Sequence, residues 1–126
     1  MREDSKRLTD MVFHGCHGTL QAEHELGQPF VVSIKLRLDL RPAGTSDDLT
    51  ESVDYGKVRY MARVMVEGSP VQLTETLAER IAAATLDEHP EVEAAKVRAA
   101  EPHVRLDGTI LASSTVEMLR RPEARP

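Results

Sequence analysis

The stretch Val32-Ser33-Ile34-Lys35-Leu36-Arg37-Leu38-Asp39-Leu40 decides the fold, because apolar and polar residues alternate along its whole length. A period of two places the apolar side chains on one face of an extended chain, which predicts a β-strand with one buried face. Before it, residues 8–14 predict a weaker strand. The polar segment 15–28 is then a long connection, and the two strands form a large hairpin.

A helix is predicted after the hairpin. Arg41-Pro42-Ala43-Gly44 breaks the strand pattern, and the helix that follows ends at Glu67-Gly68-Ser69-Pro70. Its apolar residues recur at helical spacing and are Val58, Met61, Ala62 and Met65.

A second helix is predicted up to His89-Pro90. Thr74 is a candidate N-cap, and Glu75 lies in the first turn, where the helix dipole favours a carboxylate. The apolar stripe of this helix consists of Leu73, Leu77, Ile81 and Ala84.

Two further strands, residues 96–100 and 115–120, complete the order ββααββ. This order is typical of an α+β fold in which two helices cover one face of an antiparallel sheet. A four-stranded sheet has two open edges, and its apolar face exceeds what two short helices cover. We therefore expect several copies of the chain to associate.

The composition predicts one globular domain spanning residues 1–126, with flexible ends at 1–6 and 121–126. A net charge of −5 and an aromatic content of 3% argue against a nucleic-acid partner. The apolar runs are shorter than the roughly 20 residues that a membrane span needs. The first residues lack the apolar core of a signal peptide, which predicts a cytoplasmic protein, and the single cysteine, Cys16, excludes an internal disulfide. A small organic substrate is the expected partner.

Four segments, in order and at the right spacing, resemble the dihydroneopterin aldolase family over about residues 7–120. They are His14-Gly15-Cys16-His17-Gly18, Glu23-His24-Glu25-Leu26-Gly27-Gln28-Pro29-Phe30, Val53-Asp54-Tyr55-Gly56 and Leu73-Thr74-Glu75-Thr76-Leu77-Ala78-Glu79-Arg80-Ile81-Ala82. The resemblance implies the tunnelling fold, in which four subunits join their sheets into a barrel and two such rings usually stack into an octamer. It also implies retro-aldol cleavage of 7,8-dihydroneopterin in folate biosynthesis, without a metal or a cofactor.

The resemblance assigns the recognition of a pterin to Glu75, whose carboxylate would accept two parallel N–H bonds from the amino-pyrimidinone edge. Without the family, Glu75 would be a carboxylate that complements the helix dipole. The resemblance also implies that backbone groups bind the substrate, near Leu73 and Thr74 and near Val53 and Asp54. In the family the site lies between subunits, so these segments need not come from one chain.

Proton-transfer residues are also implied by the resemblance. Tyr55 matches a catalytic tyrosine, although its position equally suits an amphipathic residue at a helix start. Glu23 matches a glutamate that approaches the substrate side chain, although a solvated loop glutamate is the default. His17 is assigned to the substrate site, with a hydrogen-bonded structural histidine as the equal alternative. The spacing of the histidines matches no recognised metal-binding set, so no metal is predicted.

The segment Val97-Arg98-Ala99-Ala100-Glu101-Pro102-His103 differs from the family, which has a lysine before the proline. In the family this lysine interacts with charge that develops on the pterin ring, and a carboxylate reverses the local sign. His103 or Arg105 in the following loop is a candidate replacement. Alternatively, Glu101 itself serves as an acid or base near Glu23.

Three functions are compatible with these residues. The first is a working dihydroneopterin aldolase. The second is a divergent paralogue that acts on another pterin-like heterocycle in a specialised pathway. The third is a non-catalytic pterin binder, against which the joint presence of Glu23, Tyr55 and Glu75 argues.

Overall fold

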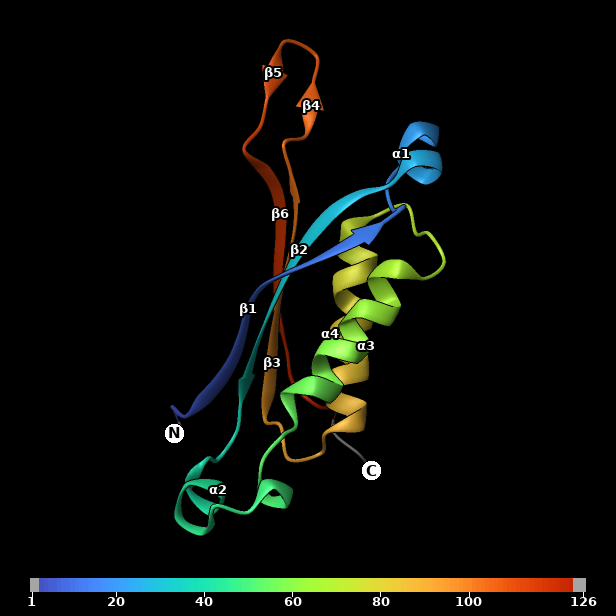
Figure 1. The fold of residues 1–126 in the computed structure, drawn as a ribbon. Coiled ribbons are helices and arrows are strands. Elements are labelled where there is room, and N and C mark those ends of the chain that lie inside the picture. The colour runs from blue at the N-terminus through green and yellow to red at the C-terminus, as the bar shows by residue number, and fades with distance from the viewer. Residues whose placement is uncertain (1–2, 124–126) are drawn as a thin grey trace.

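A four-stranded antiparallel sheet with two long helices on one face forms the body of the chain (Figure 1). The computed structural model describes residues 3–123. In chain order the elements are β1 (Ser5–Gly15), α1 (Gln21–Leu26), β2 (Gln28–Arg37), α2 (Arg41–Ser46), the single turn η1 (Leu49–Glu51), α3 (Tyr55–Glu67), α4 (Thr74–Glu88), β3 (Ala94–Pro102), β4 (Arg105–Leu106), β5 (Thr109–Ile110) and β6 (Ser113–Arg120).

The strand order of the main sheet is β1-β2-β3-β6, and all three pairings are antiparallel. The predicted α+β layout and the ββααββ order of the main elements are therefore confirmed. β1 and β6 are the edge strands of this sheet. Their outer edges present backbone groups that no other strand of the described chain pairs with.

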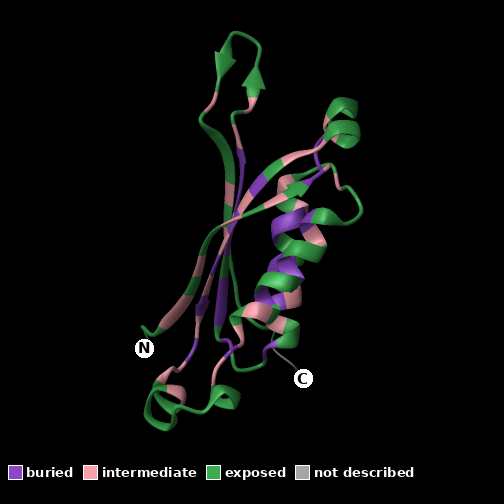
Figure 2. Cartoon of the chain, in the orientation of Figure 1, coloured by how far each residue is buried: buried purple, intermediate pink, exposed green. Residues whose placement is uncertain are grey.

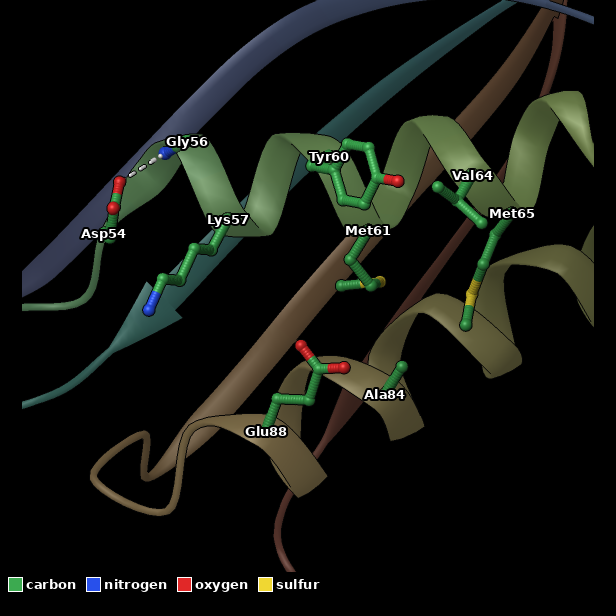
Figure 3. Close-up of a pocket in the computed structure, with 9 residues that line it drawn as sticks. All are labelled: Asp54, Gly56, Lys57, Tyr60, Met61, Val64, Met65, Ala84 and Glu88. Carbon is green, nitrogen blue, oxygen red and sulfur yellow. Dashed lines mark hydrogen bonds between the residues drawn. The ribbon is translucent and has the colours of Figure 1, made fainter.

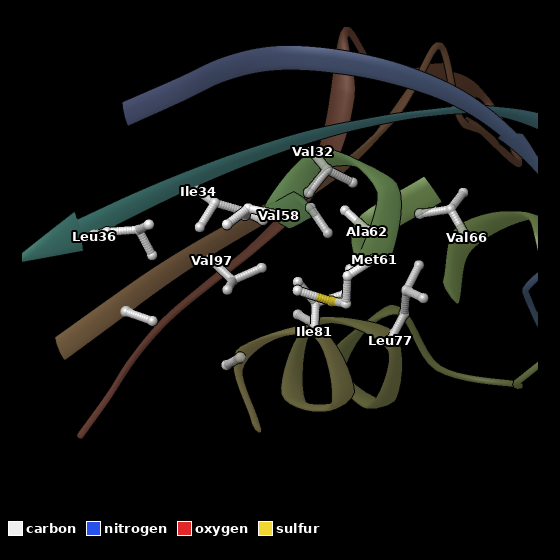
Figure 4. Packing of buried hydrophobic residues seen from close by; sticks show 14 of the residues in the cluster. Val32, Ile34, Leu36, Val58, Met61, Ala62, Val66, Leu77, Ile81 and Val97 are labelled. Atoms are coloured by element: carbon white, nitrogen blue, oxygen red, sulfur yellow. The ribbon is translucent and has the colours of Figure 1, made fainter. Parts of the chain in front are cut away.

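Alternate residues of β2 form the centre of the hydrophobic core. Phe30, Val32, Ile34 and Leu36 are buried, as the period of two predicts, whereas the residues between them point to the other face of the sheet. The buried row packs against the inner sides of α3 and α4 (Figures 2 and 4). The helix residues in this cluster are Val58, Met61, Ala62, Val66, Leu77, Ala78, Ile81 and Ala82.

Several short elements form in segments that were predicted to be connections. α1 falls within the segment between the first two strands, and α2 follows the strand break, with Pro42 in its first turn, where a proline costs no hydrogen bond. β4 and β5 form a small hairpin that extends beyond the main sheet (Figure 1).

β1 begins at Ser5, so two residues predicted to be flexible belong to a strand. Residues 1–2 and 124–126 of the predicted flexible ends lie outside the described residues.

The start of α4 differs from the prediction in one respect. Leu73 is the N-cap residue, and Thr74 is the first residue of the helix, so the prediction of Thr74 as N-cap is wrong. The physical reason is that the Thr74 hydroxyl donates a hydrogen bond to Glu101 on β3 instead of accepting one from its own helix. The helix ends at Glu88 with His89 as its C-cap, in agreement with the end predicted at His89-Pro90. Among residues 3–123, no helix has the length and apolar content to cross a lipid bilayer.

Candidate functional site

Glu101, near the end of β3, is the centre of a polar cluster at one end of the sheet. Its side chain is on the helix-covered face, and the residue is only 9% exposed. The Thr74 hydroxyl donates to Glu101 Oε1 at 2.6 Å, and the Gln28 amide donates to Oε2 at 3.3 Å. Both carboxylate oxygens of this buried acid are therefore hydrogen-bonded, as a buried charge requires.

Glu23 lies on the other side of the same amide. Gln28 Nε2 donates to Glu23 Oε2 at 3.0 Å, and the Leu20 backbone N–H donates to Oε1 at 3.0 Å. The hydrogen bond from the Leu20 N–H fixes the Glu23 side chain at the first turn of α1. Gly18, with a φ of 132°, makes room for this arrangement, because a Cβ there would lie 2.5 Å from the Glu23 carboxylate.

Gln28 thus joins the Glu23 and Glu101 carboxylates through one amide group. The prediction that Glu101 lies near Glu23 agrees with this geometry. Gln28 was missed as a site residue, although it stands in one of the four family-like segments at the first position of β2. Its position next to a strand end is the signal that could have identified it.

His17 is fully buried, and backbone groups use both of its ring nitrogens. Nδ1 accepts from the Val71 N–H at 3.1 Å, and Nε2 lies 2.7 Å from the Val66 carbonyl oxygen. The ring also packs edge-on against Phe30, with 5.3 Å between centroids. This geometry favours the structural interpretation of His17: it ties the loop that precedes α4 to the sheet.

The first residues of α4 lie beside this cluster, since Thr74 contacts Glu101 directly. Glu75 is exposed in the first turn, and within residues 3–123 its carboxylate forms no hydrogen bond or ion pair. Leu73 is half exposed. The Thr76 and Leu77 N–H groups donate to the Leu73 carbonyl, whereas the Thr74 and Glu75 N–H groups form no hydrogen bond within residues 3–123. This helix start therefore combines two available donors with a carboxylate that has no partner there.

Val53, Asp54 and Tyr55 form a second group at the start of α3. Lys6 Nζ donates to the Val53 carbonyl oxygen at 2.9 Å and lies 5.4 Å from the centroid of the Tyr55 ring. Asp54 Oδ1 accepts from the Gly56 N–H at 2.9 Å and caps the helix. The Tyr55 side chain is 64% exposed.

The two groups of predicted site residues lie at opposite ends of α3. Tyr55 begins this helix, whereas the 68–73 connection at its end leads to Glu75 (Figure 1). A helix of 13 residues is about 20 Å long. One chain therefore brings together Glu23, Glu101, Thr74 and Glu75, and it does not bring them to Tyr55.

A groove between α3 and α4 is separate from the carboxylate cluster. It has a volume of about 490 Å³, and Asp54 is the only predicted site residue among those that line it (Figure 3). Met61, Val64 and Met65 make most of its wall apolar, with Lys57 and Glu88 at one end. Glu23, Tyr55, Glu75 and Glu101 are not among the residues that line this groove.

His103 and Arg105, the candidates to replace a lysine, are exposed at the base of the β4–β5 hairpin. The His103 backbone N–H donates to the Ala112 carbonyl, and among the described residues neither side chain forms a hydrogen bond or ion pair with Glu101. Within residues 3–123, no group of three or more His, Cys, Asp or Glu side chains is arranged to hold a metal ion.

The fold and the carboxylate cluster define a tunnelling-fold protein. The structure of Escherichia coli dihydroneopterin aldolase in complex with neopterin superimposes with a TM-score of 0.84 at 22% identity, over 93% of this chain and 98% of that one. The structure of a Burkholderia dihydroneopterin aldolase bound to guanine superimposes with a TM-score of 0.73 at 26% identity, over 95% and 92%.

Sequence comparison identifies the family. The family described as dihydroneopterin aldolase matches residues 7–119. The dihydroneopterin aldolase of Bacillus subtilis is 38% identical over 105 residues, which are 83% of this chain and 88% of that protein. The chain belongs to the dihydroneopterin aldolase family.

Proposed function

We propose that the chain is a lyase that binds 7,8-dihydroneopterin and cleaves it to 6-hydroxymethyl-7,8-dihydropterin and glycolaldehyde, a step of folate biosynthesis. The observation that carries the proposal is the junction of Glu23, Gln28 and Glu101 beside Glu75, whose carboxylate has no partner within residues 3–123. A cytoplasmic location belongs to the same proposal, and the free thiol of Cys16 suits a reducing compartment.

Recognition would centre on Glu75. Neopterin and guanine, the ligands of the two similar structures, share an edge with an amino group and a ring N–H side by side. A carboxylate accepts both N–H groups in parallel, and such charge-assisted pairs are about twice as strong as neutral ones. Backbone groups at Leu73 and Thr74 would add donors and acceptors on the same side of the ring.

Cleavage would need a base, an electron sink and an acid. The base removes the proton of the hydroxyl on the second side-chain carbon, and the bond between the first and second carbons breaks. Its electron pair moves into the reduced pterin ring, glycolaldehyde leaves, and an acid protonates the first carbon. We assign these proton transfers to Glu23 and Tyr55, with Gln28 holding the Glu23 and Glu101 carboxylates in place.

The separation of Tyr55 from Glu75 supports a site shared between copies of the chain. The open edges of β1 and β6 offer backbone groups for pairing with further strands, which would let the sheets of several copies close into a barrel. The proposal therefore includes a homo-oligomer, a tetramer or an octamer. In it, the Val53–Asp54–Tyr55 group of one copy faces the Glu75 group of a neighbour.

A direct turnover assay tests the reaction. Under anaerobic conditions, the purified chain is expected to convert 7,8-dihydroneopterin to the hydroxymethyl product with equimolar release of glycolaldehyde, both followed by chromatography. The Glu23→Gln variant, which removes one proton-transfer group, is expected to be slower by about 10²-fold or more. Binding of the ligand without any turnover would contradict the aldolase assignment.

Mixing two inactive variants tests the shared site. Tyr55→Phe and Glu75→Ala damage different groups, so dissociated and reassembled mixtures are expected to recover up to about a quarter of wild-type activity, since random exchange leaves that share of sites intact. The matched control mixes Glu23→Gln with Glu75→Ala, which lie on the same group, and is expected to recover none. Equal recovery in both mixtures would exclude the shared site.

A second candidate function is favoured by Glu101 itself. Its two hydrogen bonds hold a carboxylate, and not an ammonium, beside Glu23. A paralogue that acts on another pterin-like heterocycle would use this acidic pair to accept donor groups of a different substrate side chain. Retained ligand binding without cleavage of dihydroneopterin would favour this candidate.

A further inference from the structure

The helix-free face of the sheet carries a row of cations. The strand register places Arg7 of β1 opposite Lys35 of β2, and Lys35 opposite Lys96 of β3. Directly opposed residues of antiparallel strands lie on the same face with Cβ atoms about 5 Å apart. Three positive side chains are thus immediate neighbours across three strands.

The other charges of this face compensate Lys96, but within residues 3–123 they leave Arg7 and Lys35 without a carboxylate partner. Arg98 stands between Ser33 and Glu117, and Arg37 stands opposite Ser5. Glu117 pairs with Lys96 at 3.5 Å. The second carboxylate here, Asp10, accepts a hydrogen bond from the Ser33 hydroxyl. Within residues 3–123, the side chains of Arg7, Lys35, Arg37 and Arg98 form no ion pair or hydrogen bond with a carboxylate.

A hollow of about 280 Å³ lies among these cations. It forms where β1 departs from regular pairing, because the register shifts between Leu8 and Met11, and Asp10 adopts a left-handed backbone with a φ of 56°. The charged residues that line the hollow are Arg7, Asp10, Lys35, Lys96, Arg98 and Glu117. The hollow is therefore small, polar and predominantly positive.

Like charges directly opposite one another destabilise a sheet. The row is also unusual in a chain whose net charge is −5. A bound anion would remove the repulsion, and guanidinium groups bind phosphate oxygens through paired N–H donors. An anion with several charges close together fits three neighbouring cations better than a single carboxylate does.

We propose that this hollow binds a small oligophosphate anion, contacted by Arg7, Lys35 and Arg98. The size of the hollow suits two or three linked phosphate groups. A nucleic acid fits less well, because Phe13 and Phe30 point to the opposite, helix-covered face and leave no aromatic ring here for stacking on bases. The inference does not depend on the proposed function, since none of the three residues belongs to the carboxylate cluster.

Calorimetric titration with inorganic tripolyphosphate at physiological ionic strength tests the proposal. The variant Arg7→Gln/Lys35→Gln/Arg98→Gln is expected to bind at least about tenfold more weakly than the wild type, because each lost charge-assisted contact weakens binding. The matched control Arg59→Gln/Arg63→Gln/Arg80→Gln removes the same charge from exposed positions on α3 and α4 and is expected to bind as the wild type does.

Titrations of the same three proteins also give the results that would contradict the proposal. No binding to the wild type, or an equal loss in the control variant, would overturn the proposal. Tighter binding of a single-stranded oligonucleotide that tripolyphosphate fails to displace would assign the face to nucleic acid instead.

A thermal melt checks that the triple variant is folded: removal of the repulsion is expected to leave its melting temperature unchanged or higher. If the triple variant does not fold, Lys35→Gln alone is expected to weaken binding severalfold, and unchanged binding would overturn the proposal.

Discussion

Replacement of Glu75 by alanine is expected to abolish pterin binding. The Glu75 carboxylate is exposed in the first turn of α4 and has no partner within residues 3–123, so it is free to accept two N–H groups of the ligand. Hydrogen bonds to a charged group each contribute about 1.5–3 kcal/mol, so the loss of both is expected to weaken binding by about 10²–10⁴-fold. Fluorescence titration with neopterin, which needs no turnover, measures this change.

Two variants make the Glu75 result specific. Glu79→Ala removes a carboxylate one turn later on the same helix, where it pairs with Arg120 at 2.7 Å, and is expected to leave affinity unchanged. Glu75→Gln keeps one acceptor and is expected to bind with intermediate affinity. If Glu75→Ala bound neopterin as tightly as the wild type, the assignment of pterin recognition to this helix start would be wrong.

Replacement of Glu101 by lysine is expected to raise the rate of retro-aldol cleavage. The developing negative charge on the pterin ring would then meet an ammonium in place of a carboxylate. A single well-placed electrostatic group changes kcat by about 10²–10³-fold. The new ammonium would lie beside Glu23, and it could donate hydrogen bonds to the Thr74 hydroxyl and the Gln28 amide oxygen, so the burial of the charge is compensated.

The measurement is kcat with 7,8-dihydroneopterin for the wild type, Glu101→Lys and the neutral control Glu101→Gln. If the sign of the charge decides the rate, kcat is expected to be highest for Glu101→Lys, intermediate for Glu101→Gln and lowest for the wild type. A fall in kcat for both variants would show instead that the carboxylate is a working acid or base. Neopterin affinity, measured alongside, separates an effect on chemistry from a loss of the site.

The main sheet and both long helices could be predicted because their patterns are local. The alternation along β2 and the helical spacing around Val58 and Ile81 are written in consecutive residues. α1 and the β4–β5 hairpin escaped prediction because they are too short to show a period: α1 has 6 residues and each hairpin strand has 2. Thr74 was misassigned because its hydroxyl bonds to β3, a contact that no local pattern encodes.

The candidate site residues remain predictions, and their arrangement could be predicted only in part. The family resemblance supplied Glu23, Tyr55, Glu75 and Glu101, but it did not supply Gln28 as the group that joins two of them. That junction depends on where α1 lies relative to the end of β3. The distance between Tyr55 and the other site residues follows from the length of α3, which becomes a functional constraint only once the helix is placed in space.

The pairing of β2 with β3 has a consequence for the way the chain is made. β2 is an inner strand that pairs first with β1, yet its second partner, β3, begins only at Ala94, after both long helices. At synthesis rates of about 5–20 residues per second, the edge of β2 that pairs with β3 stays open for on the order of 3–10 s before β3 leaves the ribosome. Non-local pairing of this kind slows folding. Newborn chains are thus vulnerable to aggregation in this interval, and chaperones would matter more for their yield than for the stability of the finished protein.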